Sequence, residues 1–109
     1  MPKYLIQANY TDEGLVGFVA DGAAKRLRAI KAATKSLGGK VDALHFSFGS
    51  YDCVGIADFP DNASAAAFSI MTTSTGSVII NTTPLLTVDE ADKAIGKLAK
   101  GKFRRPGGQ

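Results

Sequence analysis

The residue types that can take part in chemistry gather between residues 44 and 56. His45 is the only histidine of the chain, and an imidazole can act as a general base or bind a metal ion or haem. Asp52 offers a carboxylate, and Tyr51 offers a hydroxyl group that a ligand could contact. The stretch therefore predicts either a small polar site or a set of structural side chains.

Structural roles compete with each of these functions. A lone histidine on a strand is more often a structural residue than a ligand or a base. A carboxylate near a turn commonly accepts backbone N–H groups, so Asp52 can simply close the turn. Tyr51 can pack against Phe48 as a cross-strand pair. Cys53 is predicted to be an inert core thiol, because a nucleophilic cysteine needs a lowered pKa and a nearby base.

The two halves of the stretch predict an antiparallel hairpin. They meet at Gly49-Ser50, which is typical of a two-residue type II′ turn with a positive φ at Gly49. We expect the hairpin to close at Phe48 and Tyr51. The resulting register pairs Phe46 with Cys53, Ser47 with Asp52, and His45 with Val54.

Side chains of a strand alternate between two faces, so His45 and Asp52 fall on the same face, near enough for a hydrogen bond or an ion pair. An imidazole and a carboxylate are costly to bury among apolar side chains unless they satisfy one another or meet a ligand. Polar residues of neighbouring strands can join them there. The sequence thus predicts His45 and Asp52 as candidate catalytic residues, and Asn9, Tyr51 and Asn81 as candidate ligand-binding residues.

The elements around the hairpin follow from periodicity and capping signals. The glycines between residues 14 and 22 disfavour a helix there, so we expect the first dependable helix to begin with Asp21 as its N-cap and to end at Gly38-Gly39. A capping box at Thr87 and Glu90 predicts a last helix. The expected order is strand 4–10, helix 21–38, strands 41–47 and 51–59, a helix capped by Asp61 or Asn62, strand 77–83, and a helix from 87 to about 100.

This order is typical of the α+β class, with the ferredoxin-like arrangement β-α-β-β-α-β followed by a C-terminal helix. Two helices cover only one face of such a sheet. Because both faces of the hairpin are apolar, we expect a second copy of the chain to cover the other face, as a homodimer or a multiple of dimers. Residues 1–100 are predicted to form one domain, and residues 101–109 a disordered basic tail.

Composition and charge narrow the classes of function. The net charge of +3 comes from the C-terminal end, because residues 97–105 hold five of the 13 basic residues and no acidic residue follows Asp92. The rest of the chain has eight basic and ten acidic residues, which disfavours a nucleic-acid partner. A single cysteine favours a cytoplasmic location, and no apolar run is long enough to cross a membrane. The sequence contains no metal-site spacing, P-loop or nucleophile elbow, and the identity of any cofactor stays unknown from the residues.

Several segments, in the same order, resemble the GYD-domain family over about residues 1 to 95. They are Asn9-Tyr10-Thr11, Leu37-Gly38-Gly39-Lys40, Gly49-Ser50-Tyr51-Asp52, Pro60-Asp61 and Gly76-Ser77-Val78. The resemblance implies a dimeric α+β barrel, in which two ferredoxin-like chains pack sheet against sheet. That wider class includes cofactor-independent monooxygenases, haem-dependent enzymes, lactone isomerases and binding domains, so the fold does not select a function.

Two classes of function therefore remain open. The first is binding of a small molecule in a mostly apolar pocket between the sheet and the helices, with or without catalysis. The second is a non-enzymatic module for assembly or partner binding. The residues predict no particular ligand and no particular reaction.

Overall fold

The structure is a computed structural model that describes residues 1–108. Four strands form one antiparallel sheet in the order β2-β3-β1-β4, which is the ferredoxin-like topology. The predicted α+β class is confirmed. In chain order the elements are β1 (Lys3–Tyr10), α1 (Asp12–Asp21), α2 (Ala23–Ser36), β2 (Lys40–Phe46), β3 (Cys53–Asp58), α3 (Asn62–Thr73), β4 (Val78–Leu85), α4 (Val88–Gly96) and the 3₁₀ turn η1 (Lys97–Ala99).

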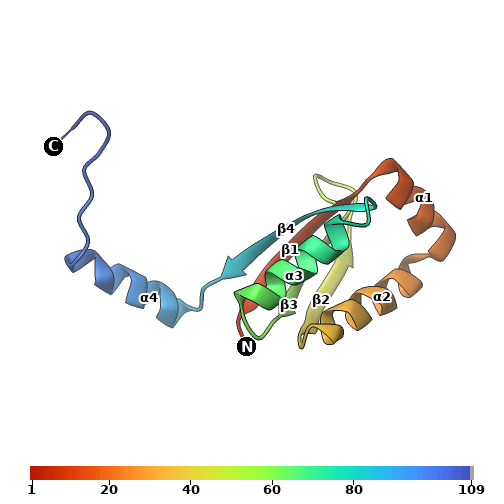
Figure 1. Cartoon of the computed structure of the whole chain (residues 1–109), viewed down its shortest axis with the longest axis horizontal. Helices are drawn as coiled ribbons and strands as arrows, with labels where there is room; N and C mark the ends of the chain where they lie inside the picture. Colours follow the sequence, from red (N-terminus) through yellow and green to blue (C-terminus); the bar gives the residue numbers. More distant parts are fainter. Residues whose placement is uncertain (109) are drawn as a thin grey trace.

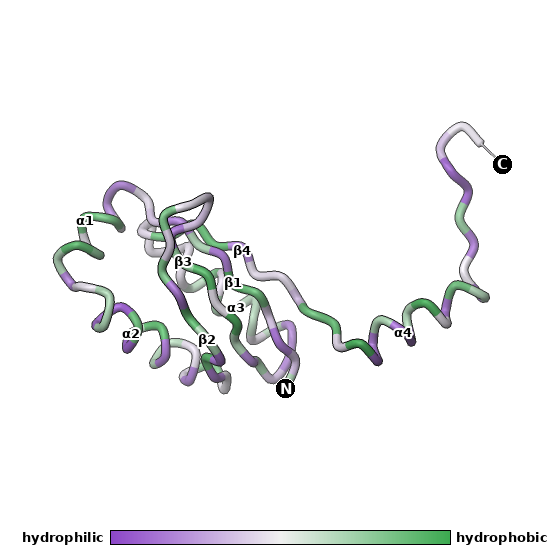
Figure 2. The backbone as a smooth tube through the Cα atoms, turned by 180° about the vertical axis from the view of Figure 1, so that it is seen from behind, coloured by the Kyte–Doolittle hydropathy of each residue, from purple (hydrophilic) through white to green (hydrophobic). Residues whose placement is uncertain are grey.

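Helices α2 and α3 lie on the same side of the sheet, α2 along β2 and α3 along β4 (Figure 1). Burial alternates along β1 and β3 in agreement with this arrangement. The core packs the ring of Phe59 against Phe68 and Tyr4, with ring centroids 5.5 Å and 5.8 Å apart. Tyr4 also donates its hydroxyl to Asn62 Oδ1 at 2.6 Å, so its buried oxygen is satisfied. The other face of the sheet, toward the viewer in Figure 2, carries no helix from residues 1–108.

The predicted hairpin register is confirmed, because His45 pairs with Val54 and Phe46 with Cys53. The predicted turn is wrong. Gly49 does not have a positive φ, and Phe48 is fully exposed instead of packing against Tyr51. The strands are joined by a longer loop, residues 47–52. Across its base the Ser47 amide donates to the Asp52 carbonyl at 2.8 Å, and the Asp52 amide donates to the carbonyl of Ala8 on β1 at 2.9 Å.

The prediction of Asp21 as an N-cap is also wrong. A full helix, α1, precedes it, capped by the Thr11 hydroxyl, which accepts from the Gly14 amide at 3.1 Å. Gly14 is required by packing rather than by flexibility, since a Cβ there would lie 1.9 Å from the Ser77 carbonyl oxygen. Gly22, at φ +82°, then separates α1 from α2. Gly14 therefore allows α1 to approach Ser77 closely, and Gly22 allows the bend between α1 and α2. Helix propensity alone predicts neither role.

The C-terminal part leaves the body of the protein. Strand β4 is an edge strand, and α4 begins with the predicted capping box of Thr87 and Glu90. Figure 1 shows α4 beyond the end of the sheet. The radius of gyration is 17.3 Å, against about 13 Å for a compact chain of this length. Within the described residues, no helix is long and apolar enough to span a bilayer. Residues 101–108 contain no helix or strand, and Gln109 of the predicted tail lies outside the described residues.

Candidate functional site

The predicted site residues fall into two groups in the structure. His45 and Asn81 lie on the uncovered face in one row across the sheet, in which His45 pairs with Val54, Val54 with Gln7, and Gln7 with Asn81. Both His45 and Asn81 are exposed. Because they lie on opposite edge strands, three strand spacings of about 4.8 Å put them roughly 14 Å apart.

The second group is Asn9, Tyr51 and Asp52 at the loop between β2 and β3. The Tyr10 amide donates to Asp52 Oδ2 at 2.9 Å, and Asn9 Nδ2 donates to the Ser50 carbonyl at 3.2 Å. These bonds attach the loop to β1. No hydrogen bond joins His45 to Asp52 among residues 1–108. The five residues do not converge on one cavity within a single chain.

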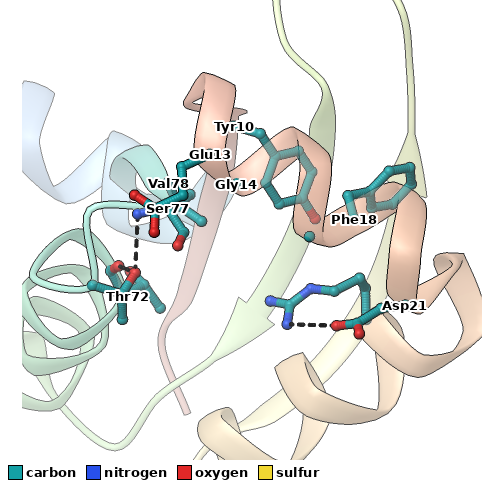
Figure 3. A pocket seen from close by; sticks show the side chains of 11 residues that line it. Tyr10, Glu13, Gly14, Phe18, Asp21, Thr72, Ser77 and Val78 are labelled. Atoms are coloured by element: carbon teal, nitrogen blue, oxygen red, sulfur yellow. Dashed lines mark hydrogen bonds and ion pairs between the residues drawn. The ribbon is translucent and has the colours of Figure 1, made fainter.

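A cavity opens instead on the helical side, between α1, α2, the end of α3 and the sheet. Its volume is about 390 Å³, within the range of small-molecule sites. Figure 3 shows the acidic Glu13 and Asp21 of α1 and the hydroxyl group of Thr72 around the space, together with the rings of Tyr10 and Phe18. The lining residues are Tyr10, Glu13, Gly14, Gly17, Phe18, Asp21, Arg26, Thr72, Thr75, Ser77 and Val78.

Two aromatic rings, those of Tyr10 and Phe18, line the cavity, and Phe18 also packs against Phe46 outside the lining. The Phe18 ring of α1 lies 5.2 Å from the Tyr10 ring of β1 and 5.2 Å from the Phe46 ring of β2, measured between centroids. Rings at such distances attract one another through dispersion and quadrupole interactions. The contacts tie the short helix α1 to the sheet and so keep the cavity open on its other side.

Arg26 supplies the positive charge of the cavity. It lies on the inward side of α2, one turn before Ile30, and its nearest carboxylate oxygen, Asp21 Oδ2, is 4.0 Å from Nη1. The Nε atom of Arg26 is buried and has no hydrogen-bond partner. A buried unsatisfied donor is costly, so this N–H group favours a ligand that carries an acceptor.

A smaller apolar recess of about 50 Å³ continues the cavity toward the core. Tyr10, Arg26, Thr72 and Val78 line both spaces. The deeper lining is apolar, and it includes Cys53, whose pKa burial raises to about 11. Burial also raises the pKa of Tyr10, although the nearby Arg26 guanidinium opposes this shift. Both groups are therefore neutral at neutral pH.

The described residues contain no group of three or more histidine, cysteine, aspartate or glutamate side chains that could hold a metal ion. The cavity lining itself offers two carboxylates, Glu13 and Asp21, with the arginine between the helices. Such a set suits hydrogen bonding to a polar organic group better than metal binding. The cavity lining is thus amphipathic, with aromatic rings beside charged and hydroxyl groups.

Sequence reasoning missed the cavity residues, although one signal was available. Arg26 stands on the same helical stripe as Ile30 and Leu37, whereas the other basic residues of α2 point outward. A charged residue on the inward stripe marks a polar pocket in the packing. Phe18 gave no such signal, because α1 was not expected to be a full helix.

Fold and cavity together define a ferredoxin-like α+β domain with an amphipathic pocket between the sheet and its helices. The sequence profile of the GYD domain matches residues 4–95, so the chain belongs to the GYD domain family. Comparisons with proteins of curated function and with solved structures give no significant match. The predicted family membership is confirmed, and the activity has to be argued from the cavity.

Proposed function

We propose that this protein binds a small, largely apolar molecule in the cavity beneath α1. The observation that carries the proposal is the guanidinium of Arg26, whose Nε is buried and unpartnered, beside the rings of Tyr10 and Phe18 in a cavity that also holds carboxylate and hydroxyl groups. A ligand that places an acceptor group, such as a carboxylate, against the accessible part of the Arg26 side chain, which is 29% exposed, would pair with its guanidinium. Its apolar part would lie against the rings of Tyr10 and Phe18.

The size of the cavity limits the ligand. At about 30 Å³ for each water-sized group, 390 Å³ holds on the order of a dozen non-hydrogen atoms. One aromatic ring with a short acidic side chain fits this limit. The carboxylates of Glu13 and Asp21 at the mouth would disfavour ligands with several negative charges.

The groups around the cavity favour binding over nucleophilic catalysis. A cysteine attacks as the thiolate, and a pKa of about 11 keeps the Cys53 thiol protonated near neutral pH. The raised pKa of Tyr10 likewise leaves a neutral hydroxyl group, which can donate a hydrogen bond to a ligand. Any reaction in this cavity would have to use Tyr10 as a donor or the carboxylates at the mouth as bases.

The test is a titration with phenylacetate followed by NMR, in wild type and in Arg26→Met. Methionine keeps much of the length and the apolar stem of the arginine but removes its donors. Arg28→Met is the matched control, because Arg28 is exposed on the same helix. We expect Arg26→Met to weaken binding at least about tenfold, as for loss of a charge-assisted hydrogen bond, and Arg28→Met to leave it unchanged. Equal binding by all three proteins, or shifts confined to the uncovered face, would refute the proposal.

We also propose that the protein works as a homodimer joined through its uncovered sheet face. The support is the apolar character of that face, where Leu5, Val54 and Ile56 are only half-buried and Ile79 is 63% exposed. Apolar patches of this extent commonly mark protein interfaces. His45 and Asn81 would lie in this interface, so any polar site containing them would be completed by the second copy.

Sedimentation at micromolar concentration tests the homodimer. We expect a dimer for wild type and a monomer for Ile79→Asp, because a charge buried in an apolar sheet interface has no partner. Ile70→Asp is the matched control, since Ile70 is exposed to a similar degree, 69%, but lies on α3. A monomeric wild type at these concentrations would exclude this assembly.

A cytoplasmic location fits the single, buried and unpaired Cys53.

A further inference from the structure

Helix α4 carries an apolar stripe that nothing in the described chain covers. Val88, Ile95 and Leu98 are exposed to 81%, 63% and 72%, and together with Ala91 they repeat at intervals of three and four residues. We call residues 86–99, which hold α4 and η1, the C-terminal arm. Leu86, at the base of this arm, is 64% exposed. This spacing places Val88, Ala91 and Ile95 on one side of α4, with the charged residues on the other side, and Leu98 follows in the turn η1. Such a stripe is typical of a helix that packs against another surface.

The helix itself also needs that surface. Its N-terminus is well encoded, because the Thr87 hydroxyl accepts from the Glu90 amide at 3.1 Å while the Glu90 carboxylate accepts from the Thr87 amide at 3.0 Å. Nevertheless, α4 has only nine residues, and isolated helices shorter than about 12–15 residues are marginal in water. A stable α4 therefore requires tertiary or intermolecular packing.

The uncovered sheet face provides less area than a stable homodimer interface needs, so a second contact surface is required. Strands of six to eight residues, spaced about 4.8 Å apart, outline a face on the order of 400 Å². A stable protein interface buries about 800 Å² per partner. The face alone thus provides about half of the area. One side of an arm some 20 Å long and 10 Å wide adds on the order of 200 Å², and the surface that receives the partner's arm adds the same.

A second exposed apolar patch lies at the opposite end of the molecule. Leu15, Val16 and Val19 of α1 are exposed to 49%, 72% and 76%. They lie on the side of α1 opposite to Gly14, Gly17 and Phe18, which line the cavity. Both views show α1 at one end of the sheet and α4 beyond the other end (Figures 1 and 2). A two-fold axis perpendicular to the long dimension brings the arm of one copy to the α1 end of the other.

We propose that the two copies of the homodimer exchange their C-terminal arms, so that the apolar stripe of α4 packs on the α1 patch of the partner. The proposal rests on the homodimer proposed above and adds a second, symmetric pair of contacts to the sheet interface. Because the α1 patch and the cavity lining occupy opposite sides of one helix, the partner's arm would hold α1 in place over the ligand site.

The experiment measures the dimer dissociation constant by sedimentation of full-length variants. The arm variant is Ile95→Asp with Leu98→Asp, and its matched control is Lys97→Asp, which changes the net charge by the same amount between the two positions but off the apolar stripe. The patch variant is Val16→Asp with Val19→Asp. We expect the arm and patch variants each to raise the dissociation constant at least about 100-fold, and Lys97→Asp to leave it near the wild-type value. Circular dichroism of each variant checks that the body remains folded.

Combining the arm and patch variants locates the contact. If α4 packs on the partner's α1, the combined variant is little weaker than either alone, because both remove the same contact. Additive losses, or a patch variant that dimerises like wild type, would overturn the docking on α1. An arm variant that dimerises like wild type would overturn arm exchange while leaving the sheet-face homodimer intact. A monomeric wild type would refute the homodimer and arm exchange together.

Discussion

Gly14 and Gly17 lie one turn apart on α1, and the structure predicts opposite effects for the same substitution at the two positions. A Cβ on Gly14 would lie 1.9 Å from the Ser77 carbonyl oxygen and 2.8 Å from its carbonyl carbon. Real Cβ atoms essentially never approach closer than 3.0 Å, so α1 would have to move by about 1 Å or more. A Cβ on Gly17 meets nothing within 4 Å.

The magnitudes follow from packing and helix propensity. Overpacking typically costs about 1–3 kcal/mol, and movement of α1 also weakens the hydrogen bond from the Thr11 amide to the Ser77 carbonyl, now 3.0 Å long. Replacing glycine by alanine inside a helix stabilises the folded protein by about 0.5–1 kcal/mol. We therefore expect Gly14→Ala to lower the free energy of unfolding by about 1–2 kcal/mol, and Gly17→Ala to raise it by about 0.5–1 kcal/mol.

Urea denaturation followed by circular dichroism measures both changes. In thermal melts, 1 kcal/mol corresponds to roughly 4–8 °C for a domain near this size. Gly17→Ala controls for helix propensity, because it adds the same methyl group to the same helix. A Gly14→Ala protein as stable as wild type would refute the close packing of α1 on the start of β4, and with it the shape of the cavity.

Four further predictions concern the core, the thiol, which gives two of them, and the hairpin loop. Phe59→Ala should lower the free energy of unfolding by about 3–5 kcal/mol in urea titrations, because the ring is fully buried; a loss below about 1 kcal/mol would contradict its position. Native Cys53 should resist alkylation by iodoacetamide at pH 8 until the protein is unfolded, and fast labelling of the native protein would contradict its burial. Because the unfolded thiol ionises near its ordinary pKa of 9.0 and the folded thiol only near about 11, the unfolded state binds fewer protons between these values, so stability should fall as the pH rises from 9 to 11. Gly49→Val should change the melting temperature by less than about 2 °C, since Gly49 has no positive φ and a Cβ there meets nothing within 4 Å.

The candidate site shows where reasoning from the sequence reaches its limit. The register of the hairpin follows from local pattern, so His45 and Val54 are paired as predicted. Distances across the sheet depend on strand order, and β2 and β4 form opposite edges, which separates His45 from Asn81. The bond from the Tyr10 amide to Asp52 Oδ2 depends on where β1 ends relative to the loop, a relation between segments 42 residues apart. Local periodicity carries no information about such contacts.

The sequence by itself determined the order of the strands and of every helix except α1, the family, the capping box at Thr87 and the alternation of faces, because each of these depends on residues within a few positions of one another. Only the tertiary structure decided the roles of the glycines in α1 and the presence of the cavity. Gly14 is needed because Ser77, 63 positions later in the chain, packs against it, and helix propensity does not register that neighbour. Arg26 becomes a ligand-binding candidate only when α1 and α2 close over the sheet and leave its Nε without a partner. Packing of distant segments, and not local preference, creates the unsatisfied donor on which the proposed function rests.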